Sequence, residues 1–164
     1  MTGAKKPFAE FLLKAVVLFA FIALAPALRA EQIVANGLVR VASAHPMAET
    51  IDRLKKDVAD KGIMLFAEID QSRLAANAGI ALHPSTLLLF GNPPLGTQFM
   101  TSNPEAGIDW PVRLLVFQDD TGRVWVVYND FVWIAQRHGI TDREQQFRMA
   151  SMVIASITSS VSGK

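Results

Sequence analysis

The stretch RLLVFQDDTGRVWVVYN, residues 113–129, decides the fold class that the sequence predicts. Two apolar runs, 113–118 and 124–129, are separated by a polar segment that contains DDTG at 119–122. Runs rich in Val, Phe and Trp on either side of a short segment that contains glycine are typical of a β-hairpin. We therefore expect an antiparallel pair of strands here.

Upstream of this hairpin, the sequence predicts three further strands and one long helix. The strands are expected at residues 38–43, 63–69 and 86–90, the first with alternating apolar positions and the last continuously apolar. One or two helical turns are expected at 72–77. The long helix precedes the second strand and ends at Gly62, a favourable helix stop. Its apolar stripe has +4, +3, +4 spacing and consists of Met47, Ile51, Leu54 and Val58.

Residues 95–109 and the segment after the hairpin are less regular. Gly96, Pro104 and Gly107 interrupt the first of these regions, so we expect it to be loop-like. After the hairpin, residues 131–138 predict a short helix that ends before Gly139.

The last helix is predicted to open with a capping box formed by Thr141 and Glu144. Its buried stripe is expected to consist of Phe147, Ala150, Val153 or Ile154, Ile157 and Val161. The element order is then β-α-β, short helix, β, loop, β-hairpin and helix. This order favours an α+β two-layer sandwich, with a largely antiparallel sheet and two long helices on one face. We expect a single domain over residues 31–164, with its core between 37 and 161.

The first 30 residues have the features of a secretory signal peptide. Three lysines form a basic start, residues 15–25 are an unbroken apolar run, and small residues follow. An eleven-residue run is too short, as a helix, to cross a hydrocarbon core of ~30 Å. We therefore expect no permanent membrane span after cleavage. Cleavage is expected after Ala30 or Ala27, which would deliver the chain to the periplasm or the medium by the general secretion route.

Composition narrows the classes of partner. The first 30 residues hold four of the 16 basic residues and one of the 15 acidic ones, so the remaining chain has a net charge of −2. A mildly acidic chain lacks the basic surface that nucleic-acid binding requires, and that partner class is excluded. The absence of cysteine excludes disulfides, iron–sulfur or cysteine-zinc sites and a thiol nucleophile.

Several short strings occur in a characteristic order along residues 38 to about 140. They are TIDRLK at 50–55 with KG at 61–62, FAEID at 66–70, LFGNP at 89–93 with GT at 96–97, IDWP at 108–111, YND at 128–130 and RHG at 137–139. Together they resemble the domain of unknown function 302 family. The resemblance implies a β-α-β-β-β-β-α layout related to the TATA-binding-protein type, and no settled activity. The family often has histidine after the aspartate of the FAEID string, where this chain has Gln71.

Polar residues at predicted strand ends are the candidates for ligand binding. Side chains at the rim of a sheet can converge on a small ligand. Alternatively, Asp70 and Asn92 bond to the backbone of their own turns, and Asp109 does the same before the next strand. The candidate ligand-binding residues are Asp70, Asn92, Asp109, Tyr128, Asn129 and His138.

His138 is the best single candidate for a catalytic residue, because imidazole titrates near neutral pH. Its position in the last turn before Gly139 gives a structural alternative, in which the ring satisfies the carbonyl groups at the end of its helix. His45 and His83 have no second ligand at i+2, i+3 or i+4, so no local metal site is expected.

Three functions are consistent with these features. The leading one is an exported, non-catalytic module that binds a small ligand or a partner protein, without a cofactor. The second is a small hydrolase or isomerase that uses His138 with Asp70 or Asp109. The third is metal or haem handling through His and Met side chains such as Met149 and Met152, although methionine is more often a core residue.

Overall fold

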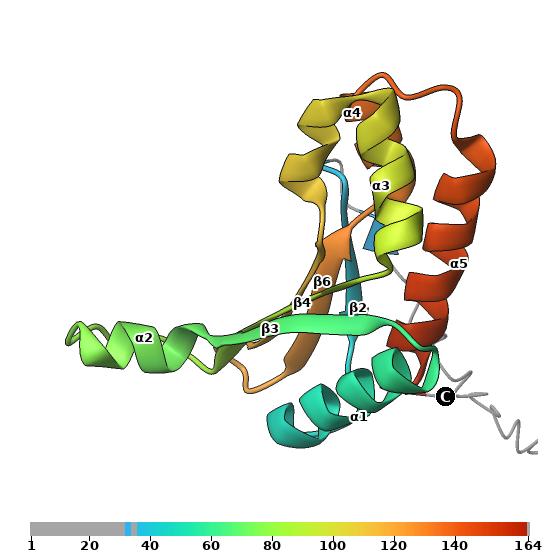
Figure 1. Ribbon diagram of the computed structural model, residues 1–164. Coiled ribbons are helices and arrows are strands. Elements are labelled where there is room, and N and C mark those ends of the chain that lie inside the picture. The colour runs from blue at the N-terminus through green and yellow to red at the C-terminus, as the bar shows by residue number, and fades with distance from the viewer. Residues whose placement is uncertain (1–31, 34–35, 164) are drawn as a thin grey trace, which may run out of the picture.

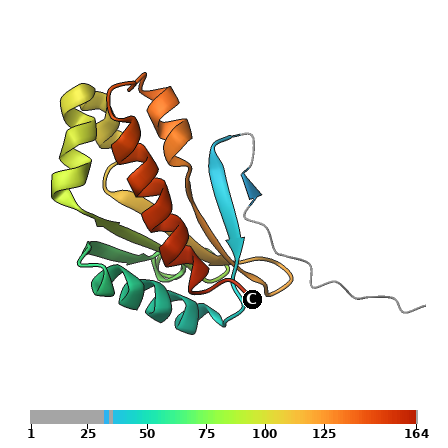
Figure 2. The same cartoon turned by 90° about the vertical axis from the view of Figure 1, so that its right-hand side faces the viewer.

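The structure is a computed structural model that describes residues 32–33 and 36–163. It consists of one sheet with the two longest helices, α1 and α5, on the same face (Figures 1 and 2). All neighbouring strands pair antiparallel, in the order β1-β2-β6-β5-β4-β3. The predicted α+β two-layer sandwich is therefore confirmed. The predicted signal peptide lies outside the described residues.

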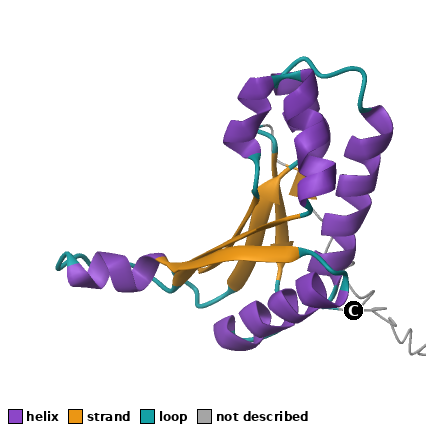
Figure 3. Ribbon diagram, in the orientation of Figure 1, coloured by secondary structure: helices purple, strands orange, loops and turns teal. Residues whose placement is uncertain are grey.

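Figure 3 distinguishes the strands from the helices. The strands are β1 (Gln32–Ile33), β2 (Leu38–Ala42), β3 (Met64–Asp70), β4 (Ser85–Gly91), β5 (Val112–Gln118) and β6 (Val124–Asn129). The helices are α1 (Met47–Asp60), α2 (Gln71–Asn77), α3 (Pro93–Ser102), the 3-10 helix η1 (Pro104–Asp109), α4 (Phe131–Arg137) and α5 (Glu144–Ser159).

The β5–β6 hairpin forms as predicted, and Asp119 holds its turn. The Asp119 carboxylate accepts hydrogen bonds from the backbone N–H groups of Thr121 and Arg123, at 2.9 and 3.0 Å. It also accepts hydrogen bonds from the Thr121 hydroxyl at 2.6 Å and the Trp125 indole N–H at 2.7 Å. These hydrogen bonds lower the pKa of Asp119 well below its ordinary value. The bond from the Thr121 hydroxyl has the largest effect, followed by that from the Trp125 indole.

The core lies between the sheet and the long helices, where apolar stripes of α1 and α5 meet alternate residues of the strands. Leu54 and Val58 of α1 and Ile157 of α5 are fully buried, as the predicted stripes require. Of the two alternatives in the last stripe, Ile154 is the buried one. The strands contribute Val39, Val41, Leu88, Phe90, Leu114, Val116, Val124, Val126 and Tyr128.

The prediction that residues 95–109 are loop-like is wrong, because this region forms α3 and η1. Asn92 caps α3 by accepting a hydrogen bond from the Leu95 backbone N–H, and prolines occupy the first two helical positions, where the lost N–H costs nothing. Gly96 is tolerated inside this helix because the Trp110 ring packs on it. A Cβ atom at Gly96 would lie only 1.8 Å from that ring.

The predicted capping box at Thr141 is also wrong. Helix α5 begins at Glu144, its N-cap residue is Arg143, and no side chain caps it. The Arg143 guanidinium donates instead to the backbone carbonyl of Gln98 in α3 at 3.3 Å. A tertiary contact with α3 therefore accompanies the start of this helix in place of the local motif.

Candidate functional site

Five of the six predicted ligand-binding residues lie at one end of the sheet. β4 ends beside the start of β5, where Phe90 pairs with Val112, and β6 ends at Asn129. Asn92, Asp109, Tyr128, Asn129 and His138 all follow or adjoin these strand ends. Asp70 pairs with Thr86 at the opposite end of the β3–β4 ladder. The prediction that the polar residues at strand ends converge at the rim of the sheet is therefore wrong for Asp70.

Asp70 and Asn92 act as helix caps, as the turn-holding alternative predicts. The Asp70 carboxylate accepts hydrogen bonds from the Arg73 backbone N–H at 2.8 Å and from the Ser72 hydroxyl at 2.7 Å. The Ser72 bond, followed by the Arg73 backbone bond, lowers the pKa of Asp70. Each carboxylate or amide oxygen satisfies an N–H group that the first turn of a helix leaves unpaired.

Asp109 and His138 form a buried contact that joins η1 to the end of α4. The Asp109 Oδ2 atom lies 2.7 Å from the His138 Nε2 atom, and both side chains are almost completely buried. The imidazole therefore contacts a carboxylate from another element and does not cap its own helix. The amide group of Asn103 donates to the His138 backbone carbonyl at 2.9 Å, a second link between the same two segments.

Two arginines place positive charge near the Asp109 carboxylate. The guanidinium of Arg137 lies 3.2 Å from it, and that of Arg113 lies 4.0 Å from it. A buried carboxylate is costly unless it is paired and hydrogen-bonded. This cluster meets that requirement with three cationic or imidazole groups. Neither Asp109 nor His138 lines the groove described next, so the cluster supports the sheet end from within.

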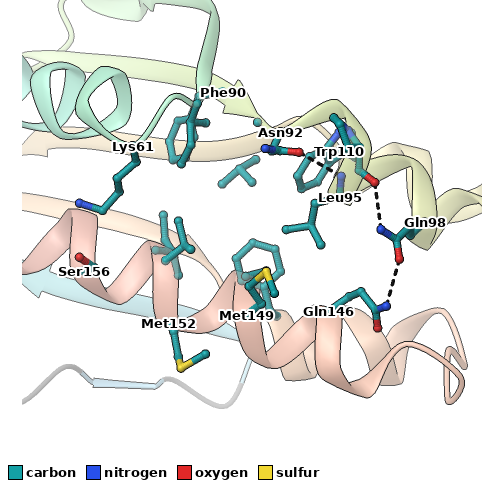
Figure 4. Close-up of a pocket in the computed structure, with 18 of the residues that line it drawn as sticks. Lys61, Phe90, Asn92, Leu95, Gln98, Trp110, Gln146, Met149, Met152 and Ser156 are labelled. Carbon is teal, nitrogen blue, oxygen red and sulfur yellow. Dashed lines mark hydrogen bonds between the residues drawn. The ribbon is translucent and has the colours of Figure 1, made fainter.

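A groove lies between α3 and α5 and is here called the α3–α5 groove (Figure 4). Its cavity volume is about 620 Å³. Phe90 and Val112 of the sheet, together with Trp110, contribute apolar surface to it. Leu95 lines it from α3, and α5 contributes Met149, Ala150, Met152 and Val153.

Polar side chains lie at both ends of this groove (Figure 4). Lys61, which follows α1, and Ser156 of α5 mark one end. At the other end the Gln146 amide donates to the Gln98 side-chain oxygen at 3.0 Å, and the Gln98 amide donates to the Pro94 carbonyl at 3.1 Å. An apolar body with a few polar groups at its ends is the usual composition of a small-molecule site.

The comparisons with known proteins bear on this architecture. The family model for the domain of unknown function DUF302 matches residues 39–157. This chain belongs to the DUF302 family. A crystal structure of an uncharacterized conserved DUF302 protein from Bacillus stearothermophilus matches with a TM-score of 0.70 at 17% identity, covering 76% of this chain and 98% of that one. At this identity the likeness shows a shared DUF302 fold.

Curated relatives contain a related stretch. Proteins named fluoride-specific ion channel FluC 1 in Brucella suis and in Brucella abortus are each 41% identical over 108 residues. The match covers 66% of this DUF302 chain but only 42% and 40% of those relatives. The chain therefore spans about two fifths of the length of the curated relatives it matches. In the described part of this DUF302 chain, no helix has both the length and the apolar character to span a membrane.

Tyr128 and Asn129 of the DUF302 sheet do not line the α3–α5 groove. Tyr128 is buried and borders a smaller neighbouring hollow of about 280 Å³, which shares Phe131, Met152 and Ile154 with the groove. Asn129 is half-buried and pairs with Leu38 in the β2–β6 ladder. Of the predicted residues, only Asn92 lines the groove itself.

Most residues that line the groove were not predicted as site residues, because apolar side chains in a helix or strand are expected to belong to the core. Met149 and Met152 are 46% and 67% exposed, although methionine usually fills cores. Their position off the buried stripe of α5 is the signal that could have identified them. Within residues 32–33 and 36–163, no group of three His, Asp or Glu side chains is arranged to hold a metal ion.

Proposed function

We propose that this DUF302 domain is a non-catalytic module that binds a small molecule with an apolar body and a polar or anionic end in the α3–α5 groove. The main support for this proposal is the groove itself. Its volume of about 620 Å³ falls in the range of ~300–1,000 Å³ typical of small-molecule sites. Its exposed thioethers on α5 are flexible and polarizable, which suits an adaptable apolar contact.

The polar ends of the groove determine which ligands fit. Lys61 supplies an ammonium group at one end, and its nearest acidic partner, Asp57, is 3.8 Å away, a weak ion pair. An anionic end group would gain more from Lys61 than a hydroxyl would. Gln98 and Gln146 offer amide groups to a polar atom at the far end. A medium-chain carboxylate is the simplest molecule with this distribution.

The test compares decanoate with decanol by isothermal titration calorimetry. Both molecules have the same chain, so their difference isolates the end group. We expect both to bind, decanoate more tightly, and Lys61→Met to remove the preference while leaving decanol binding intact. Met149→Glu, on the exposed wall of the groove, should weaken both ligands at least tenfold. Val132→Glu alters a similarly exposed apolar residue of α4 outside the groove and should change neither.

Two results would contradict this proposal. One is the absence of binding by either probe. The other is binding that Met149→Glu leaves unchanged. Sodium fluoride is titrated in a separate experiment, because the curated relatives are named fluoride-specific ion channels. A response to fluoride without a response to either decyl compound would replace the proposed ligand class.

A hydrolase or isomerase that uses His138 is the second candidate, favoured by the 2.7 Å contact with Asp109. The alternative that pairs His138 with Asp70 has no geometric support, because Asp70 belongs to the opposite end of the sheet. We place catalysis second to binding because both side chains of the Asp109–His138 pair are buried, whereas a reacting group must reach its substrate. Screening the domain with esters and amides tests it, and any turnover abolished by His138→Gln would favour the enzyme.

Export is part of the proposed function. The support for it is the basic and apolar pattern of residues 1–30, which is typical of a signal peptide. Expression of the whole chain in a Gram-negative host, followed by fractionation and N-terminal sequencing, tests this proposal. We expect periplasmic protein that begins after Ala30 or Ala27, whereas full-length protein in the cytoplasm or membrane would contradict export.

A further inference from the structure

Strand β3 is an unprotected edge of the sheet. Among the described residues it pairs only with β4, so the backbone groups on its other side have no strand partner. Natural edge strands are usually shielded by charges, prolines or a covering element, because bare edges pair with other chains. β3 contains no proline, and the charge of Glu68 is engaged by Lys55 of α1 at 2.7 Å.

β3 also begins with exposed apolar side chains. Met64, Leu65 and Phe66 are 54%, 37% and 44% exposed, although they are consecutive residues of a strand. The register of the β3–β4 ladder shifts between Leu65 and Ala67, so Phe66 lies at an irregularity that turns successive side chains outward. The Met64 end of the edge is therefore apolar.

Helix α2 carries a second exposed apolar patch at the other end of the same edge. It projects beyond the sheet as an extension of β3 (Figure 1), and none of its residues is buried. Leu74 is 56% exposed, and in the connection to β4 Ile80 and Leu82 are 62% and 51% exposed. An isolated seven-residue helix is not stable in water through its own hydrogen bonds. Contact with another surface would stabilise it.

We propose that two copies of this chain associate through their β3 edges, antiparallel and about a twofold axis near the middle of the strand. The axis reverses the second copy, so the partner's α2 comes to the Met64 end of the first copy. The two apolar patches, separated on one copy by the length of β3, then meet across the interface. Such self-complementarity is what an isologous dimer requires.

The exposed area is consistent with a dimer of standard size. At roughly 150–200 Å² per large apolar side chain, the exposed fractions of the six residues amount to on the order of 500 Å² per copy. A standard interface buries ~800 Å² per partner, and the backbone and polar atoms of β3 would supply the remainder.

Cysteine cross-linking tests the geometry, because the chain has no cysteine of its own. Single cysteines are introduced in turn from Phe66 to Ile69 into the full chain, purified as the cell processes it, and oxidised. Directly opposed residues of antiparallel strands are ~4.5–5.5 Å apart at Cα, within reach of a disulfide. We expect a covalent dimer at one position of the scan, the one on the axis. Glu105→Cys, an exposed residue of η1, should remain monomeric.

Charge variants test which surfaces meet. Light scattering should find a dimer for the natural chain and a monomer for Phe66→Lys and for Leu74→Glu. The double variant should regain the dimer, because lysine of one copy then faces glutamate of the other. Val132→Lys, equally exposed elsewhere, should stay dimeric. A monomeric natural chain, a dimer that both single variants retain, or no cross-link along β3 would overturn the proposal. These readouts need no ligand, so they are independent of the α3–α5 groove.

Discussion

The Nε2 atom of His138 lies 2.7 Å from the Oδ2 atom of Asp109, and their side chains are 5% and 3% exposed. The two residues are 29 positions apart and belong to the ends of α4 and η1. Their contact, reinforced by Arg137, connects the segment before β5 to the segment after β6. This contact holds the two segments together at the end of the sheet that adjoins the α3–α5 groove.

Removal of the Asp109 carboxylate should destabilise the domain strongly. Asp109→Ala leaves Arg137 without its counter-charge and the buried His138 ring without its hydrogen-bond partner, and breaking a buried pair from one side costs about 3–5 kcal/mol. Urea unfolding followed by circular dichroism measures the loss. Asp142→Ala removes an exposed carboxylate that pairs with Arg143 and should cost less than about 1 kcal/mol. Equal effects of the two variants would contradict a structural role for the Asp109 cluster.

The hairpin turn should weaken in acid through Asp119. Its hydrogen bonds lower the pKa of the folded carboxylate below that of the unfolded chain, so the stabilisation is fully present above the unfolded pKa of ~3.9. It is lost progressively as the pH falls toward the folded pKa. Asp119→Asn should therefore be less stable than the natural chain at pH 7, with a difference that shrinks below pH ~4. A difference independent of pH in urea titrations would contradict this assignment.

A methyl group at Gly96 should damage both α3 and the groove. Gly→Ala inside a helix usually stabilises by roughly 0.5–1 kcal/mol, but here the new Cβ would overlap the Trp110 ring. We expect a net loss of about 1–3 kcal/mol and weaker decanoate binding, because the ring must move. Thermal unfolding and near-ultraviolet circular dichroism measure both effects. Gly163→Ala, outside the helices and with its nearest neighbour 3.6 Å away, is the control and should be neutral.

Trp110 should report on ligand in the groove. It lines the cavity, whereas Trp125 and Trp133 do not, so a fatty acid brominated along its chain should quench only part of the total tryptophan fluorescence. Trp110→Phe should abolish this quenching and retain the emission of the other two. Quenching that persists in Trp110→Phe would show that the ligand binds outside the α3–α5 groove.

Much of the fold was predictable because its signals are local. The β5–β6 hairpin is marked by two apolar runs and a glycine-containing turn, and α1 by the stripe that includes Leu54 and Val58. Such patterns depend on the periodicity of one segment and on hydrogen bonds within a few residues. Helix α3 was missed because its interior Gly96 disfavours a helix locally, and only the Trp110 ring from outside explains the residue.

The candidate site depended on contacts that no local pattern contains. Asp70 and Asn92 are both polar residues at strand ends, yet the antiparallel β3–β4 register assigns them to opposite ends of the sheet. His138 meets Asp109, and Met149 faces a groove, only because α4 and α5 pack where they do. The chain's own pattern predicted the strands β2 to β6, the two long helices and their buried faces, since each arises from neighbours in the chain, whereas the two-residue strand β1 was not predicted. Which side chains share a cavity was decided by the pairing and packing of distant segments.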